Sequence, residues 1–165
     1  MLVDLVNTKS SDDVTLSGIV LEPETPRQDL LVDAMVMIHG SGGNFYLSPS
    51  NPRAMKLRDM GIPTALFNTR GHDVIGGRAG SIRTGNAYEK LSETHLDVQA
   101  MVNFMVAKGY KRVCIWGSSL GAVRVILAQA NKKSEIMKGE GDGKRNQIFN
   151  AAFGLSLIHI SEPTR

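Results

Sequence analysis

Residues 117–121 read Gly-Ser-Ser-Leu-Gly and fit the pattern G-x-S-x-G. They directly follow the apolar run 113–116 and directly precede the helix-forming run 122–130. A serine at a sharp strand-to-helix turn exposes its hydroxyl at the strand end, and the helix N-terminus favours the negative charge that develops during nucleophilic attack. Flanking glycines relieve the crowding in such a turn. We therefore predict that Ser119 is a catalytic nucleophile rather than the capping serine of an ordinary turn.

A second glycine-rich segment follows another apolar run. Residues 39–44 read His-Gly-Ser-Gly-Gly-Asn, and glycines let the backbone approach a ligand so that amides can point at an oxyanion. A nucleotide-binding loop is the alternative. However, no Gly-Lys-Ser/Thr follows, and Phe45 interrupts the pattern G-x-G-x-x-G. The segment therefore favours an oxyanion-binding loop.

Composition and charge exclude several other classes of function. The net charge is +3, and the basic residues are spread along the chain without a face that alternates with aromatics, so nucleic-acid binding is not expected. A single cysteine, Cys114, excludes a disulfide framework and a multi-cysteine metal site. No apolar stretch approaches the roughly 20 residues of a membrane span, and no secretory signal is visible. We expect a cytoplasmic protein without a metal or organic cofactor.

The elements that must position these segments follow from the apolar patterns. Strands and helices alternate along the chain, which predicts an α/β fold with a mostly parallel sheet, helices on both faces and an antiparallel first strand pair. The expected strands are residues 14–21, 34–39, 63–68, 111–116 and 148–153, and the expected helices are residues 52–60, 91–108 and 120–130.

Over residues 14–130 the sequence resembles the α/β-hydrolase superfamily, in particular its lipase, esterase and peptidase-like members. The resemblance rests on the His-Gly segment, on residues 70–73, which read Arg-Gly-His-Asp, and on the G-x-S-x-G motif. Two positions depart from the usual pattern: Ser118 stands where histidine is more frequent, and Asp73 replaces a glycine.

The resemblance implies roles for individual residues. Ser119 would be acylated, and the backbone amide of Leu120 would donate to the oxyanion. The second donor would be the amide of Ser41, with Gly42 close enough to compete. The implied reaction is hydrolysis of a small-molecule ester, or less readily an amide, through an acyl-enzyme. A non-catalytic ligand-binding member of the fold is the alternative, because a fold does not determine a function.

The C-terminal part raises a separate expectation. The triad order in this fold is serine, acid, histidine, and after Ser119 the sequence offers only His159 as a base. Asp142 falls in residues 138–144, a glycine-rich stretch that we expect to be flexible. Residues 155–165 resemble the in-frame translation of a sequencing adapter. We therefore expect residues 1–154 to be a partial, incomplete α/β-hydrolase domain, residues 155–165 to be a non-native tail, and the chain to lack significant activity. The sequence does not indicate an oligomeric state.

Overall fold

The computed structural model describes residues 3–47 and 51–160, without the side chains of Ala79 and residues 149–160. The chain divides into two compact units, residues 1–129 and residues 130–165. The loop at residues 39–44 and the G-x-S-x-G motif both belong to the first unit.

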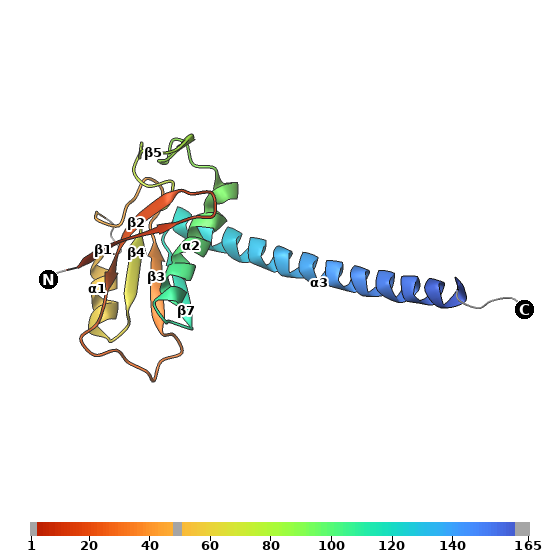
Figure 1. Cartoon of the computed structure of the whole chain (residues 1–165). Coiled ribbons are helices and arrows are strands. Elements are labelled where there is room, and N and C mark those ends of the chain that lie inside the picture. Colours follow the sequence, from red (N-terminus) through yellow and green to blue (C-terminus); the bar gives the residue numbers. More distant parts are fainter. Residues whose placement is uncertain (1–2, 48–50, 161–165) are drawn as a thin grey trace, which may run out of the picture. The chain divides into compact units, whose positions relative to one another are not determined.

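A five-stranded mixed sheet forms the centre of the first unit (Figure 1). Strands β4, β3 and β7 run parallel to one another, whereas β2 pairs antiparallel with β4 and with the edge strand β1. This arrangement confirms the expected α/β sheet. Its antiparallel edge differs from the expected first pair, because β2 pairs with β1, a strand that was not predicted, and with β4, and not with β3. The sheet order is β1 (Asp4–Lys9), β2 (Thr15–Leu21), β4 (Thr64–Phe67), β3 (Ala34–Ile38), β7 (Val113–Gly117).

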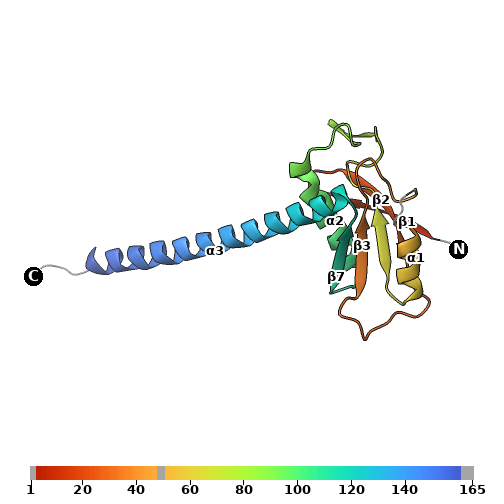
Figure 2. The ribbon, with the colours of Figure 1, turned by 180° about the vertical axis from the view of Figure 1, so that it is seen from behind.

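Helices cover both faces of this sheet, as expected. Successive strand residues point to opposite faces, so β3 sends Val36 to one core cluster and Met37 to another. The cluster of Val36 also contains Met101 of α2 (Thr94–Ala107), while the cluster of Met37 contains Ala54 of α1 (Asn51–Asp59). Figure 2 shows α1 beside β4. β3 and β4 are therefore buried on both sides, which explains their nearly continuous apolar sequences.

Two details between β4 and β7 differ from the expected elements. The helix expected over residues 91–108 begins as a 3₁₀ turn, η1 (Leu91–Glu93), before α2. A short hairpin, β5 (Arg78–Ala79) with β6 (Ile82–Arg83), precedes it and was not predicted. Each of its strands has two residues, which is too short for an alternating pattern to be visible.

The final helix corrects the prediction for the C-terminal part. α3 runs over Leu120–Ile160, so the expected strand at residues 148–153 and the flexible stretch at 138–144 are both wrong. Residues 120–160 contain no proline, and once a helix is nucleated each further residue adds one hydrogen bond. Side-chain pairs at helical spacing support the extension: Asn131 donates to Glu135 at 3.1 Å, and Arg145 lies 3.6 Å from Asp142.

The last turns of α3 overlap the tail expected at residues 155–165. The backbone of residues 155–160 continues α3, whereas residues 161–165 of the expected tail, like the side chain of His159, lie outside what the structure describes. Within the described part of the chain, no helix is both long and apolar enough to cross a membrane.

Candidate active site

Ser119 occupies a strained turn between β7 and α3. Its φ is +53°, a value that residues other than glycine rarely adopt, and its side chain is exposed. Backbone hydrogen bonds close the turn: the Gly121 amide donates to the Ser118 carbonyl at 2.8 Å, and the Ala122 amide donates to the Ser119 carbonyl at 2.9 Å. The Ser118 amide donates to the Ile38 carbonyl at 3.1 Å, which attaches the turn to the end of β3.

The two glycines of the motif are required by close contacts. A Cβ atom on Gly117 would overlap the backbone of Gly121, and one on Gly121 would lie 2.5 Å from the Ile38 carbonyl oxygen. The motif G-x-S-x-G thus reflects the crowding between β7, the start of α3 and the end of β3, as the sequence predicted.

The loop after β3 lies directly beside Ser119. A Cβ atom on Gly40 would be 3.2 Å from the Ser119 Cβ. The Gly43 amide donates to the Gly40 carbonyl at 3.2 Å, closing a turn with Ser41 and Gly42 at its centre, and the φ of Gly42 is +59°. The exposed Ser41 hydroxyl donates to the side chain of Asn86 at 2.8 Å.

His39 is buried and fixed rather than free to act as a base. The Thr69 amide donates to its Nε2 at 3.0 Å, so its Nδ1 carries the hydrogen and donates to the Gly40 carbonyl at 2.7 Å. Burial lowers the pKa of His39 to about 4, which keeps the ring neutral at neutral pH. His39 therefore holds the loop that faces Ser119.

A buried ion pair lies beneath this loop, and the sequence did not reveal it. Arg124 of α3 is fully buried and binds both carboxylate oxygens of Glu89, at 2.8 and 2.7 Å. Its Nη1 also donates to the His39 carbonyl at 2.7 Å. Arg124 therefore joins the N-terminal part of α3 to the loop after β3 and to the segment before α2. Its only signal in the sequence is a single arginine within the apolar run 122–130.

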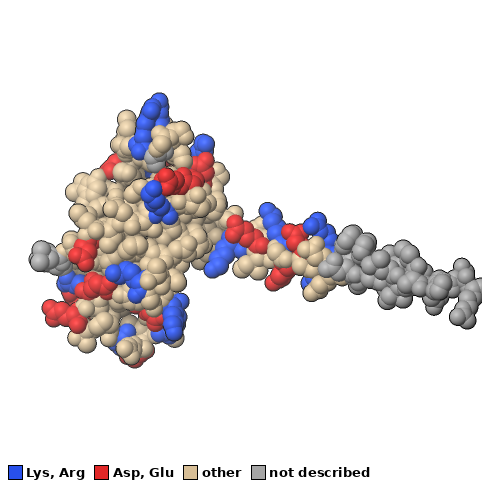
Figure 3. Space-filling view, in the orientation of Figure 1, with Lys and Arg blue, Asp and Glu red and all other residues tan. Residues whose placement is uncertain are grey.

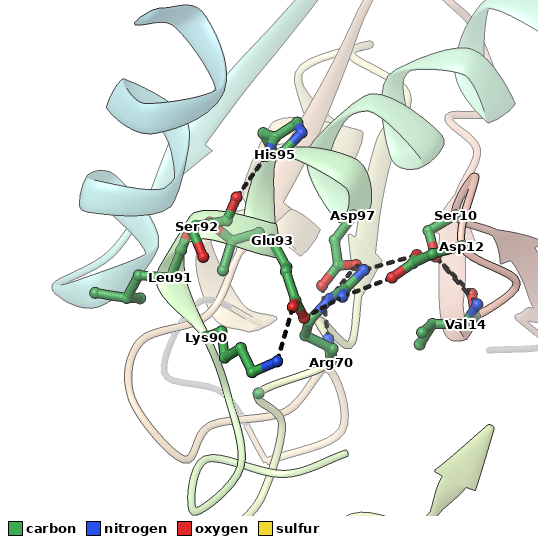
Figure 4. A network of polar contacts seen from close by, with 12 residues as sticks. Ser10, Asp12, Val14, Arg70, Lys90, Leu91, Ser92, Glu93, His95 and Asp97 are labelled. Carbon is green, nitrogen blue, oxygen red and sulfur yellow. Dashed lines mark hydrogen bonds and ion pairs between the residues drawn. The ribbon is translucent and has the colours of Figure 1, made fainter. Parts of the chain in front are cut away.

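A second buried arginine, Arg70, holds the loop after β4 (Figure 4). Its Nε donates to Asp97 at 2.9 Å, its amide donates to the same carboxylate at 2.8 Å, and its Nη atoms reach Asp12 and Glu93. The hydrogen bond from Arg70 lowers the pKa of Asp12 below its usual value. Burial opposes the charge of Arg70, but the hydrogen bonds that Arg70 donates to Asp12 and Asp97 raise its pKa overall. The network ties the β1–β2 turn, η1 and α2 to this loop.

Asp73 stands where the Arg-Gly-His-Gly motif of the α/β-hydrolase superfamily has its last glycine. The backbone conformation of Asp73 explains why glycine is usual at this position. Its φ is +54°, a left-handed value that aspartate tolerates better than most residues. Its carboxylate accepts hydrogen bonds from Asn44 at 2.6 Å, Tyr46 at 2.7 Å and His72 at 2.7 Å. Burial would raise the pKa of Asp73, but these hydrogen bonds hold it below the usual range. Asp73 therefore keeps the turn and links it to the loop after β3.

The described residues provide no base for Ser119. His39 and His72 bond as given above, and His95 lies 2.8 Å from the Ser92 carbonyl through its Nδ1. Among the side chains that the structure describes, none forms a hydrogen bond with Ser119, and no group of three histidine, cysteine or acidic residues could hold a metal ion.

Solved structures with the same arrangement of strands and helices decide the fold. The chain has an α/β-hydrolase fold. It aligns with the α/β hydrolase GrgF from Penicillium sp. sh18 at a TM-score of 0.61 and 16% identity, over 78% of this chain and 41% of that one. For the esterase Pf2001 from Pyrococcus furiosus the TM-score is 0.57 at 22% identity, over 77% and 45%. For the acetyl xylan esterase from Paenibacillus sp. R4 it is 0.55 at 19% identity, over 77% and 48%.

The chain therefore spans less than half the length of these α/β hydrolases. No protein-family model matches the sequence, and no curated protein matches it.

Within the α/β-hydrolase fold, three sequence-predicted residues come together at the carboxyl edge of the parallel strands. Ser119 and Leu120 lie at the turn after β7, and Ser41 lies in the adjoining turn after β3. Their catalytic roles stay predictions. A cavity of about 760 Å³ has a different location. Its lining includes Leu21 of β2, Glu22 and Arg58 of α1. It includes neither Ser119, Leu120 nor Ser41.

Proposed function

We propose that the parent protein is a serine hydrolase that cleaves a carboxylic ester, or less readily an amide, through an acyl-enzyme on Ser119. The observation that carries this proposal is the left-handed Ser119 at the turn between β7 and α3, facing Gly40. This geometry supports a nucleophile elbow, a turn in which the hydroxyl projects from the strand end. The similarity to two esterases supports an ester as the bond that is cleaved.

In the proposed reaction, the Ser119 oxygen attacks the carbonyl carbon while a general base takes the hydroxyl proton. The carbonyl oxygen becomes an oxyanion, and the amides of Leu120 and Ser41 donate to it, with Gly42 as the competing donor. The first amides of a helix lack acceptors within it, so the amide of Leu120 is free to donate in this way. Loss of one such donor costs about 3 to 4 kcal/mol of transition-state stabilisation.

The tetrahedral intermediate then collapses. The bond to the alcohol oxygen breaks, the alcohol leaves with the proton held by the base, and the acyl group stays on Ser119. Water attacks this second ester in the same way and releases the acid, which regenerates the serine. No metal or organic cofactor takes part in either step.

The general base and its acid partner lie outside the described residues in this proposal. His39, His72 and His95 have other partners, and the chain spans less than half the length of the similar hydrolases. Since a serine without its base is a poor nucleophile, we expect the chain of residues 1–165 to show no significant turnover.

The absence of a base among the described side chains also favours one alternative, a ligand-binding protein with this fold and no catalysis. Hydrolysis of p-nitrophenyl esters separates the two candidates, measured on a longer protein that contains residues 1–154 and continues past them. The serine-hydrolase proposal predicts that Ser119→Ala lowers kcat by several orders of magnitude, while Ser118→Ala, at the neighbouring position, keeps most of the activity. Saturable ligand binding without turnover would support the alternative.

A further inference from the structure

Two arginines face each other on the β5–β6 hairpin. Arg78 and Arg83 are register partners in this antiparallel pair, so their side chains leave the same face of the hairpin. Their neighbour Ile82 packs against the core cluster, and the face that carries the arginines is the opposite one. Both residues are exposed. Like charges at directly opposed positions destabilise a strand pair, so this arrangement calls for a counter-charge.

Among the described residues, no carboxylate forms an ion pair with Arg78 or Arg83. Residues 74–88 contain neither aspartate nor glutamate. The flanking acids bond elsewhere: Asp73 accepts from Asn44, Tyr46 and His72, and Glu89 binds Arg124. Among the arginines that the structure describes, all pair with a carboxylate except these two and Arg53.

The other contacts of the three unpaired arginines differ. Arg53 lies over the ring of Trp116, 5.6 Å from its centre. Arg83 lies over the ring of Tyr88 at 5.3 Å, which orients its guanidinium but leaves its charge uncompensated. Figure 3 shows basic side chains gathered at the end of the first unit where Figure 1 labels β5.

A hollow adjoins this hairpin. Its volume is about 490 Å³, and its lining includes Arg78, His72, Thr84 and the glycines 76, 77 and 80. A Cβ atom on Gly80 would meet nothing within 4 Å, so that part of the wall is open backbone. Lys9 and Asp13 also line the hollow, and they neutralise each other in an ion pair of 2.7 Å. The wall therefore has a net positive charge from Arg78.

We propose that the hairpin is a binding site for an oxyanion of a ligand, a carboxylate or a phosphate, held by Arg78 and Arg83. The planar guanidinium group matches both anions through paired hydrogen bonds. Asn86 contacts Ser41 and follows the hairpin by three residues, so a ligand held here lies at the edge of the sheet that carries Ser119. The site goes beyond the proposed hydrolysis, because its evidence is the uncompensated charge and not the serine.

The test is an NMR titration of the chain of residues 1–165 with inorganic phosphate and, separately, with acetate, at constant ionic strength. We expect saturable shifts of the amides of Gly76, Gly77 and Gly80 with at least one of the two anions, and the preferred anion identifies the group. Arg78→Gln and Arg83→Gln should each weaken binding at least tenfold. Arg53→Gln removes the same charge from another unpaired arginine and should leave the affinity unchanged.

Two further variants keep the result interpretable. Ser119→Ala should bind the anion as the wild type does, so failure of the hydrolase proposal would leave this site standing. Arg78→Lys, with thermal unfolding as a check on folding, retains the charge and should bind more tightly than Arg78→Gln. The proposal is overturned if no saturable shifts occur at the three glycines, or if Arg53→Gln weakens binding as much as the two hairpin substitutions.

Discussion

Replacing Arg124 with methionine removes a buried guanidinium and leaves Glu89 without its partner. In the wild type Arg124 is fully buried, the Glu89 side chain is 3% exposed, and their two contacts measure 2.8 and 2.7 Å. Breaking a buried ion pair by removing one partner costs about 3 to 5 kcal/mol, because the remaining charge is buried and uncompensated. The His39 carbonyl also loses the hydrogen bond that Arg124 donates at 2.7 Å. We therefore expect Arg124→Met to lower the free energy of unfolding by about 3 to 5 kcal/mol.

Urea unfolding followed by the fluorescence of Trp116 measures this loss, since Trp116 is the only tryptophan and lies in β7, next to the turn. The double variant Arg124→Met/Glu89→Gln removes the unpaired charge as well and should recover part of the stability. A loss below about 1 kcal/mol, the level of an exposed ion pair, would refute the account of the buried pair. A double variant less stable than the single one would refute it as well.

Two other predictions concern the crowded turn and the buried histidine. Gly121→Ala places a Cβ atom 2.5 Å from the Ile38 carbonyl oxygen and should lower the free energy of unfolding in urea by about 1 to 3 kcal/mol. The control is Gly139→Ala, at a helical glycine with open space around it, which should instead stabilise the helix by about 0.5 to 1 kcal/mol, followed by circular dichroism. Equal effects of the two substitutions would contradict the close contact between Gly121 and Ile38. The folded-state pKa of His39 is about 4, below its usual 6.5, so the unfolded state takes up a proton first as the pH falls. The free energy of unfolding should therefore fall by about 3 kcal/mol as the pH is lowered from above 6.5 to about 4. In His39→Gln, the free energy of unfolding measured in urea should depend less on pH over this range. An unchanged pH dependence would show that His39 is not buried as a neutral ring.

Much of the fold follows from local patterns. The strands β3, β4 and β7 are short apolar runs, and α2 carries an apolar stripe, so both periodicities predict their elements. α3 was harder, because the apolar run at residues 148–153 fits a strand and a buried helix equally well, and glycines 139, 141 and 143 suggested a loop. Helix extension from a nucleated first part overrides both signals.

The candidate site divides in the same way. Ser119 and the loop at residues 39–44 were predictable, because a turn with positive φ and close backbone contacts demands glycine at fixed spacing. The pairs Arg124–Glu89 and Arg70–Asp97 were not, since their partners lie 35 and 27 residues apart and nothing local to either residue indicates the other. Asp73 lies between these cases: its identity departed from the motif, and only its left-handed backbone explained why glycine is usual there.

The central claim is that Ser119 is the nucleophile. The most direct test treats a longer protein containing residues 1–154 with a fluorophosphonate probe and maps the adduct by mass spectrometry. The account predicts one phosphonylated residue, Ser119, and no adduct in Ser119→Ala, with labelling preserved in Ser118→Ala. An adduct at another residue, or no adduct in a folded protein, would contradict it.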